Sequence, residues 1–422
     1  MTAADLLVTG IGDLATLSVG PVPRTGRAMG EIGRIERAAL AVSAGRFSFV
    51  GSEAAARRNV RVRRGGQRID LAGASVLPGL VDAHTHVLFA GDRSDELARK
   101  VAGASYLEIA RHGGGLLATV RATRRASRPT LLDGTGARLG RMLAHGATTI
   151  EVKSGYALDH AGELRLLSLV PELARRTGLT LVPTYLGAHA IPPRYARRPD
   201  DYVRTIVTRT LPEVARRRLA AYCDVFCEPG FFTPAQARRI LRTALALGLG
   251  AKVHAEEFVW SGGARLAARL HATSADHLLV ARPSDLVGLA RSGVTAVLLP
   301  VSPFAAFTGM HAPGRALVDA GVPVALGSDL SPSAWVESMP LVLAHAVYSA
   351  RLTPTEAITA ATVNAAHAVG RSASAGQIAV GRPAEFVAFD LPSVEHVAYR
   401  IGTRPSLVSR QGLPVSPREV RE

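Results

Sequence analysis

The sequence predicts an α/β fold: a (β/α)8 TIM-like barrel with a small β-sandwich domain assembled from both termini. Short apolar or β-branched runs alternate eight times with segments of helical pattern, which is typical of such a barrel. No Gly-x-Gly-x-x-Gly opens a helix after the first run, and this weakens the structural alternative, a doubly wound sheet. Both flanks instead carry short strand patterns separated by glycine-rich turns.

The candidate barrel strands are short runs rich in Val, Ile, Leu or Thr that end in polar residues. They are residues 80–89, 147–156, 179–189, 223–228, 250–257, 272–279, 295–300 and 322–329. The helical segments between them carry Ala, Leu and Arg at helical spacing, often after a Pro, Ser or Thr cap. They include residues 131–145, 163–177, 234–247, 262–270 and 283–292.

The flanks supply the second domain. Residues 1–76 hold four short strand patterns, and residues 381–390 repeat the style near the other end of the chain. We therefore expect the barrel at 77–370 and the two parts of the small domain at 1–76 and 371–422.

Composition excludes several classes of protein. Of the 422 residues, 47% are hydrophobic and 20% charged, which is typical of a well-buried enzyme and not of a disordered chain. No apolar run approaches the roughly 20 residues of a membrane span, and no basic start precedes the first apolar run. We therefore expect a cytoplasmic protein without a membrane partner. Cys223 and Cys227 are expected to be buried free thiols.

The net charge of +16 raises the question of nucleic-acid binding. The basic residues are scattered, and no basic run is interleaved with aromatic side chains. We therefore expect no nucleic-acid partner and attribute the charge to solvated helix faces.

The chemistry is expected at the carboxyl ends of the barrel strands. The first strand carries His84 and His86 two residues apart, so on a strand both rings point to the same side. Later strand ends carry Lys153-Ser154-Gly155-Tyr156, Gly187-Ala188-His189, His254-Ala255-Glu256-Glu257, Asp276-His277 and Gly327-Ser328-Asp329. Three neutral imidazoles and one carboxylate suit a transition metal such as zinc or iron(II), which lowers the pKa of a bound water.

These motifs resemble the amidohydrolase superfamily of metal-dependent hydrolases and, within it, the imidazolonepropionase family of histidine degradation. The resemblance covers most of the chain. It rests on residues 78–86, 111–115, 151–156, 186–190, 226–228, 252–257, 274–278, 298–300 and 361–366.

The resemblance implies that a metal-activated water opens the ring of 4-imidazolone-5-propanoate to give N-formimidoyl-L-glutamate. It implies one divalent or trivalent ion per subunit, zinc or iron, held by His84, His86, His254 and Asp329. Besides Asp329, the catalytic residues are expected to be Glu257 and His277, for proton movement and for polarising the ring carbonyl. A straight strand would favour Glu256 as the inward residue; the family pattern favours Glu257.

The substrate is a small anionic molecule, and Arg93 suits its carboxylate because a planar guanidinium forms two parallel bonds. Tyr156 and His189 are expected to line the ring pocket by the same resemblance, and a homodimer is implied. One strand end departs from the family: Ser331, Ser333 and Ala334 stand where many members carry Asn, Gly and a hydroxyl residue. These three positions are expected to contact the substrate.

Two alternatives stay open on the sequence. Another mononuclear amidohydrolase, acting on a cyclic amide or removing an amino group from a nucleobase, would use the same metal site. A catalytically silent protein that binds nucleic acid through its basic surface is the more remote alternative. Two-metal relatives need a carboxylated lysine on the fourth strand, and residues 223–228 contain none.

Overall fold

Eight parallel strands follow one another around the barrel in chain order, which confirms the predicted fold class. The computed structural model describes residues 2–104, 108–109 and 112–415; Met1, Arg111 of the 111–115 motif and the predicted end of the small domain at 416–422 lie outside this range. The barrel strands are β5 (Leu80–Asp82), β6 (Ala147–Lys153), β7 (Thr180–Ala188), β8 (Tyr222–Cys227), β9 (Gly250–Ala255), β10 (Ser274–His277), β11 (Thr295–Leu298) and β12 (Val324–Leu326).

The barrel closes between its first and last strands through the segments that follow them. The backbone N–H of Ala83 donates to the carbonyl of Leu326 at 3.3 Å, and that of His86 donates to Leu330 at 2.9 Å. A parallel bridge joins Thr85 to Leu330. His84 and His86 therefore lie just beyond β5, which is shorter than the predicted strand, and the closure fixes their backbone.

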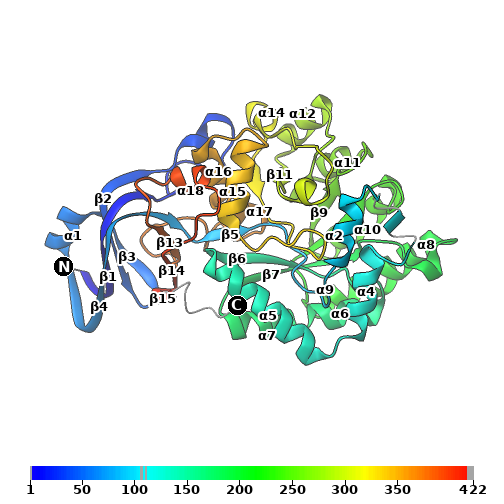
Figure 1. The fold of residues 1–422 in the computed structure, drawn as a ribbon, viewed down its shortest axis with the longest axis horizontal. Helices are drawn as coiled ribbons and strands as arrows, with labels where there is room; N and C mark the ends of the chain where they lie inside the picture. Colours follow the sequence, from blue (N-terminus) through cyan, green and yellow to red (C-terminus); the bar gives the residue numbers. More distant parts are fainter. Residues whose placement is uncertain (1, 105–107, 110–111, 416–422) are drawn as a thin grey trace.

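The helices cover the outside of the barrel (Figure 1). Helices α5, α10, α11 and α12 lie where the helical pattern predicts them. Outside the small domain, the α-helices whose bounds the structure describes are α2 (Asp95–Val101), α4 (Leu116–Arg125), α5 (Arg128–Ala144), α6 (His160–Leu167), α7 (Val170–Thr177), α8 (Pro199–Thr205), α9 (Leu211–Arg216), α10 (Pro234–Ala246), α11 (Gly263–Leu270), α12 (Pro283–Ser292), α13 (Ser302–Ala305), α14 (Gly314–Asp319), α15 (Met339–Tyr348), α16 (Pro354–Ala360) and α17 (Val363–Ala368).

One predicted helix is wrong as a single element. Residues 163–177 form the end of α6 and the whole of α7, separated by Ser168 and Leu169. Pro171 sits in the first turn of α7, where its missing N–H costs nothing. In a continuous helix the same ring would clash with the carbonyl of Leu167, so the helix breaks before it.

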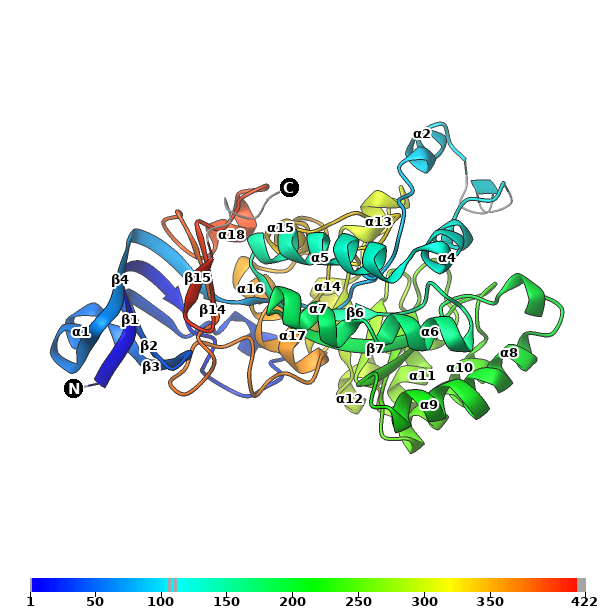
Figure 2. The same cartoon turned by 90° about the horizontal axis from the view of Figure 1, so that it is seen from below.

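The second lobe is a mixed seven-stranded sheet in the order β15-β14-β13-β4-β1-β2-β3. Strands from both ends of the chain lie side by side in it, as the blue and red ribbons of Figures 1 and 2 show. Helix α1 (Glu53–Asn59) packs on this sheet, whereas α18 (His396–Tyr399) packs against α15 and α16 of the barrel. Its strands are β1 (Thr2–Ala15), β2 (Arg34–Ser43), β3 (Arg46–Ser52), β4 (Val60–Pro78), β13 (Phe386–Phe389), β14 (Leu407–Arg410) and β15 (Leu413–Val415).

This sheet curls over itself around an apolar core, which gives it the predicted sandwich character. Phe47 of β3 and Phe386 of β13 are separated by three strands in the sheet, yet their ring centroids lie 6.3 Å apart. The N–H of Phe47 also donates to the carbonyl of Arg382 at 2.9 Å. Because β4 leads directly into β5, the small domain anchors the strand that precedes the histidine pair. The predicted domain boundaries at 76 and 370 stay predictions.

Within the described ranges, no helix has both the length and the hydropathy that a bilayer crossing requires. Cys223 and Cys227 are both buried and free.

Two half-buried histidines outside the site contribute to the dependence of the stability of the fold on pH. Burial lowers the pKa of His145 and of His367, and for His145 the charge of Arg404 adds to the effect. The unfolded chain therefore takes up protons that the folded chain does not, and stability falls as pH drops below about 6.5. We expect the midpoint of urea unfolding to fall between pH 7.5 and pH 5.5. His145→Gln/His367→Gln is expected to reduce that fall, and an equal fall in both proteins would contradict this.

Candidate metal centre and active-site pocket

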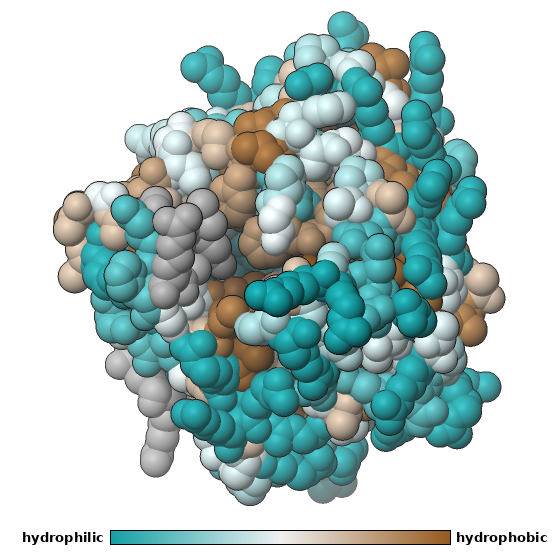
Figure 3. Space-filling model, turned by 90° about the vertical axis from the view of Figure 1, so that its right-hand side faces the viewer, coloured by the Kyte–Doolittle hydropathy of each residue, from teal (hydrophilic) through white to brown (hydrophobic). Residues whose placement is uncertain are grey.

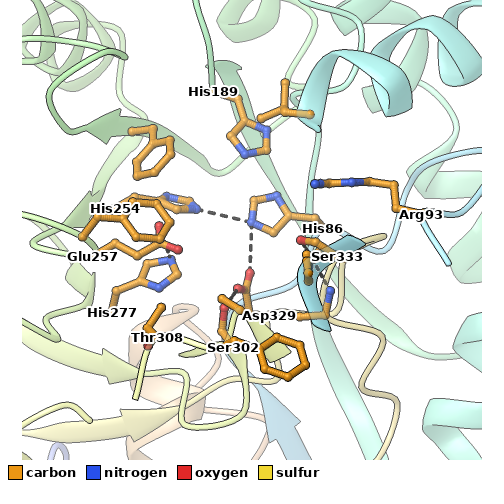
Figure 4. Close-up of a pocket in the computed structure, with 18 of the residues that line it drawn as sticks. His86, Arg93, His189, His254, Glu257, His277, Ser302, Thr308, Asp329 and Ser333 are labelled. Atoms are coloured by element: carbon orange, nitrogen blue, oxygen red, sulfur yellow. Dashed lines mark hydrogen bonds and ion pairs between the residues drawn. The ribbon is translucent and has the colours of Figure 1, made fainter. Parts of the chain in front are cut away.

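Four donor atoms from distant parts of the chain meet at one end of the barrel. Nε2 of His86 lies 3.2 Å from Nε2 of His84 and 3.3 Å from Nε2 of His254. Oδ1 of Asp329 lies 3.3 Å from Nε2 of His86 and 3.5 Å from Nε2 of His84. Figure 4 shows His86 between His254 and Asp329.

These separations match those of ligands around one metal ion. Nitrogen and oxygen ligands about 2.1 Å from a tetrahedral zinc ion lie about 3.4 Å from one another. Burial lowers the pKa of both His84 and His86, which keeps their rings neutral, as metal ligands must be. Burial would raise the pKa of Asp329, but a hydrogen bond from His86 and the nearby imidazoles outweigh it, so its carboxylate is ionised. The residues present therefore fit a transition-metal ion.

Asp329 is oriented by its own backbone and by one hydroxyl group. It has a φ of +54°, in the left-handed region, just past the end of β12. Its N–H donates to the carbonyl of His84 at 3.0 Å, which ties it to the histidine pair. Ser302 Oγ donates to Oδ2 at 2.6 Å, so Oδ1 is the oxygen turned toward the imidazoles. The sequence analysis did not identify Ser302 as a site residue, because it starts a short helix and belongs to no predicted strand.

A pocket of about 520 Å³ opens beside the donor cluster. The face seen in Figure 3 is hollowed near its centre, and hydrophobic side chains gather around the hollow. The structure brings all the predicted substrate and proton-transfer residues to this pocket. They are Arg93, Tyr156, His189, Glu257, His277, Ser331, Ser333 and Ala334.

The two neighbouring glutamates of the fifth strand end have different environments. Glu256 has a φ of +56°, and this left-handed residue breaks the alternation of the strand. Its carboxylate accepts the backbone N–H groups of Ser261, Gly262 and Ala264, and so caps α11. Glu257 is thereby turned toward the pocket. Strand parity alone would have chosen the wrong glutamate.

Glu257 and His277 form a pair suited to proton transfer. Oε2 of Glu257 lies 3.6 Å from Nε2 of His277. Burial raises the pKa of Glu257 well above its ordinary value, and the charges of Asp329 and Glu228 add to the shift. Burial lowers the pKa of His277 to about 3. Among the described residues, neither ring nitrogen of His277 has a hydrogen-bond partner. A neutral imidazole therefore faces the pocket with one donor and one acceptor available to a substrate.

Arg93 reaches the other side of the pocket, as Figure 4 shows. Its Nε and Nη2 donate to Oε2 of Glu96 at 2.9 and 2.7 Å, and both side chains are buried. Glu96 Oε1 accepts the N–H of Gly115 at 2.7 Å, which ties α2 to the glycine run. Lys100, also on α2, lines the same pocket and was not singled out from the sequence. Helix α2 stands away from the body of the barrel in Figure 2.

Tyr156 and His189 line the pocket wall next to the donor cluster. The His189 ring stacks on His86 with centroids 4.9 Å apart, and Tyr156 lies 5.3 Å from His189. Glu163 holds this wall in place because its carboxylate accepts the N–H groups of Gly155 and Ala157 at 2.8 Å. A glutamate on a helix gave no sign of this role in the sequence.

The loop after Asp329 presents hydroxyl groups to the pocket. Backbone bonds between Ser331 and Ala334 close a tight turn, and the hydroxyl groups of Ser331 and Ser333 lie 3.3 Å apart. Ser331, Ser333 and Ala334, which differ from the usual residues of the family, therefore all line the pocket wall.

Glu228, at the end of β8, is a further residue that the sequence analysis did not single out. Its carboxylate accepts the N–H groups of Glu257, Phe258 and Val259 at 3.3, 3.1 and 2.6 Å. It therefore holds the backbone that carries Glu257. Its position at a barrel strand end was the signal that could have found it.

Known sequences of one family are similar to this chain over most of its length. The model of the amidohydrolase family matches residues 75–411. The chain is 45% identical over 404 residues to the imidazolonepropionase of Symbiobacterium thermophilum, covering 95% of both chains. It is 41% identical over 418 residues to that of Bacillus velezensis, covering 97% of this chain and 98% of the relative.

Solved structures show the same fold at low identity. An adenosine deaminase from Xanthomonas campestris with bound zinc superposes with a TM-score of 0.73 at 22% identity, covering 100% of this chain and 95% of that one. Atrazine chlorohydrolase from Arthrobacter aurescens, complexed with zinc, gives a TM-score of 0.68 at 17% identity, with coverage of 97% and 95%.

Proposed function

The chain belongs to the imidazolonepropionases of the amidohydrolase family and hydrolyses the imidazolone ring in histidine degradation; we propose that His84, His86, His254 and Asp329 hold its metal ion. The observation that carries this proposal is the spacing of the donor atoms beside the pocket: those of His84, His86 and Asp329 lie 3.2 to 3.5 Å from one another, and Nε2 of His254 lies 3.3 Å from Nε2 of His86. We further propose one ion per chain, zinc or iron, because β8 offers no lysine to bridge a second.

A metal ion bound there would act as a Lewis acid and lower the pKa of a water in contact with it. Glu257 takes a proton from the attacking water as the oxygen bonds to the ring carbonyl carbon. The C–N bond of the ring amide then breaks, and Glu257 returns the proton to the leaving nitrogen. His277 donates a hydrogen bond to the carbonyl oxygen as negative charge develops on it. The product is N-formimidoyl-L-glutamate, and atoms balance with one water consumed.

The remaining pocket residues bind and orient the substrate in this proposal. Arg93 and Lys100 supply positive charge for the propanoate. Tyr156 and His189 stack against the ring, and the hydroxyl groups of Ser331 and Ser333 together with Ala334 close the far wall. We also propose a cytoplasmic homodimer, from the family resemblance, with no nucleic-acid or membrane partner.

The test is an absorbance assay on freshly generated 4-imidazolone-5-propanoate beside a panel of cyclic amides and aminopurines. We expect turnover of the imidazolone and none of the aminopurines, with metal content near one ion per chain by elemental analysis. Faster turnover of any panel member would overturn the assigned substrate.

Removing the guanidinium of Arg93 is expected to weaken substrate binding. Arg93→Ala alone would leave the Glu96 carboxylate buried without its ion pair, so Arg93→Gln/Glu96→Gln removes both charges. A charge-assisted hydrogen bond contributes about 1.5–3 kcal/mol, so KM should rise about 10- to 100-fold while kcat changes less.

The control for Arg93 is the substrate analogue whose propanoate is replaced by the neutral amide. Its KM should be nearly the same for the wild-type chain and the double variant. An unchanged KM for the charged substrate would reject the contact between Arg93 and the carboxylate.

A further inference from the structure

A layer of fully buried charges lies beneath the metal site, and the mechanism above uses none of it. Glu151 and Lys153 come from β6, Asp224 from β8, Lys252 from β9 and Asp276 from β10, and each side chain is 0% exposed. Three carboxylates and two ammonium groups give a net charge of −1. Buried charges on this scale are costly unless each is paired, so their arrangement calls for a reason.

Two of these carboxylates each lie against Nδ1 of an imidazole of the donor cluster. Nδ1 of His84 donates to Oδ2 of Asp276 at 2.6 Å. Nδ1 of His254 lies 2.9 Å from Oδ2 of Asp224. A carboxylate on Nδ1 fixes the tautomer and the ring orientation, so that the lone pair of Nε2 faces the ligand position.

Lys153 forms ion pairs with both carboxylates. Its Nζ lies 2.7 Å from Oδ2 of Asp224 and, in a longer ion pair, 3.8 Å from Oδ2 of Asp276, the same oxygens that the imidazoles use. It also lies 2.8 Å from Oε2 of Glu151. Lys252 reaches Oε1 of Glu151 at 2.8 Å and the carbonyl of Ala83 at 3.2 Å. Its charge, together with that of Lys153, opposes the rise that burial causes in the pKa of Asp276. Burial would lower the pKa of Lys153, but the charges of Asp224 and Glu151 outweigh it and raise the pKa, so this group is an ammonium.

We propose that Lys153 is a positioning residue for the metal site: its ammonium clamps Asp224 and Asp276 together, and through them fixes His254 and His84 in ligand geometry. His254 lies on β9 and His84 lies in the segment after β5. Lys153 thereby links these two ligands through the carboxylates beneath them. This inference rests on the proposed metal site, and it concerns metal binding rather than the choice of substrate.

If Lys153 acted only through its charge, removing its ammonium group would raise the affinity for a metal ion. If it positions the ligands, the same change would lower that affinity. Taking a positive charge away from the neighbourhood of a cation site strengthens cation binding by Coulomb's law. Losing a group that orients metal ligands from behind weakens metal binding by about 10- to 100-fold. The direction of the change in zinc affinity therefore shows whether Lys153 positions the ligands or only balances the buried negative charge.

The experiment is a zinc titration of the metal-free full-length chain against a chromophoric chelator. Lys153→Met keeps the unbranched stem and removes the charge, and we expect zinc affinity to fall by about 10-fold or more. Lys153→Met/Glu151→Gln keeps the net charge of the layer, since one positive and one negative charge are lost, and the same fall is expected. Glu151→Gln alone keeps Lys153 between both aspartates, so its change should stay below about 10-fold.

Equal or tighter zinc binding by Lys153→Met would overturn the clamp, as would wild-type affinity in the double variant. If Lys153→Met does not fold, the charge-balanced double variant carries the test. Failure of both to fold would assign Lys153 to the fold alone and would also overturn the proposal. A wild-type chain that binds zinc tightly without opening the imidazolone ring would count against the proposed function and not against the clamp.

Discussion

Asp329→Ala is expected to release the metal ion and to reduce turnover by about 10³-fold or more. The variant loses the only carboxylate among the four proposed ligands, and its Oδ1 lies 3.3 Å from Nε2 of His86. A metal ion supplies several kcal/mol of transition-state stabilisation, and each 1.4 kcal/mol is tenfold in rate. His254→Ala should behave in the same way. Metal content by elemental analysis and kcat on 4-imidazolone-5-propanoate measure both effects.

Asp285→Ala is the matched control for the aspartate. Asp285 is also buried, but it binds Trp260, Arg265 and the start of α12 and does not line the pocket. We expect Asp285→Ala to lower the melting temperature and to keep its metal. Full turnover with intact metal content in Asp329→Ala or His254→Ala would refute the assigned site.

Glu257→Gln is expected to keep the metal ion and to lose turnover by about 10²- to 10⁴-fold, the usual contribution of a general acid–base group. Its amide has the same shape and cannot accept the proton of the attacking water. Because burial raises the pKa of Glu257, kcat/KM of the wild-type chain should fall as pH is lowered through that raised pKa, and the fall should vanish in the variant. Single-turnover kinetics and metal analysis give the two readouts.

The neighbouring Glu256→Gln tests whether this loss is specific. Glu256 accepts three backbone N–H groups at the start of α11, and an amide in its place cannot accept all of them. We expect lower thermal stability with most of the turnover retained. If Glu256→Gln were the inactive variant and Glu257→Gln the active one, the assignment of the proton-transfer group would be reversed.

Alternation along the strands could be predicted from the sequence alone. On β9, Lys252 and His254 share parity, so both point into the barrel at successive heights, with the charged layer below the ligand layer. Glu151 and Lys153 follow the same rule on β6. The rule that alternate residues of a strand point to the same side was used for the histidines. Used for Glu151, Lys153 and Lys252 as well, it would have predicted that their charges are buried inside the barrel.

The break in that alternation could not be predicted. Glu256 has a φ of +56°, and its carboxylate accepts the N–H groups of Ser261, Gly262 and Ala264 at the start of the next helix, α11. Only the packing of that helix decides that Glu257, and not Glu256, faces the pocket. The roles of Glu228 and Glu163 are of the same kind, since each supports a loop through backbone groups that carry no side-chain pattern.

The residue types and their order therefore determined the strands and the histidines and carboxylates at the strand ends, because local propensity and the two-residue period depend only on neighbours in the chain. The choice of four ligands among them came from the family resemblance. The tertiary structure decided which donors meet, which oxygen each imidazole uses, and that Lys153 joins Asp224 to Asp276. Those distances connect residues of different strands, and they are set by the register in which the barrel closes.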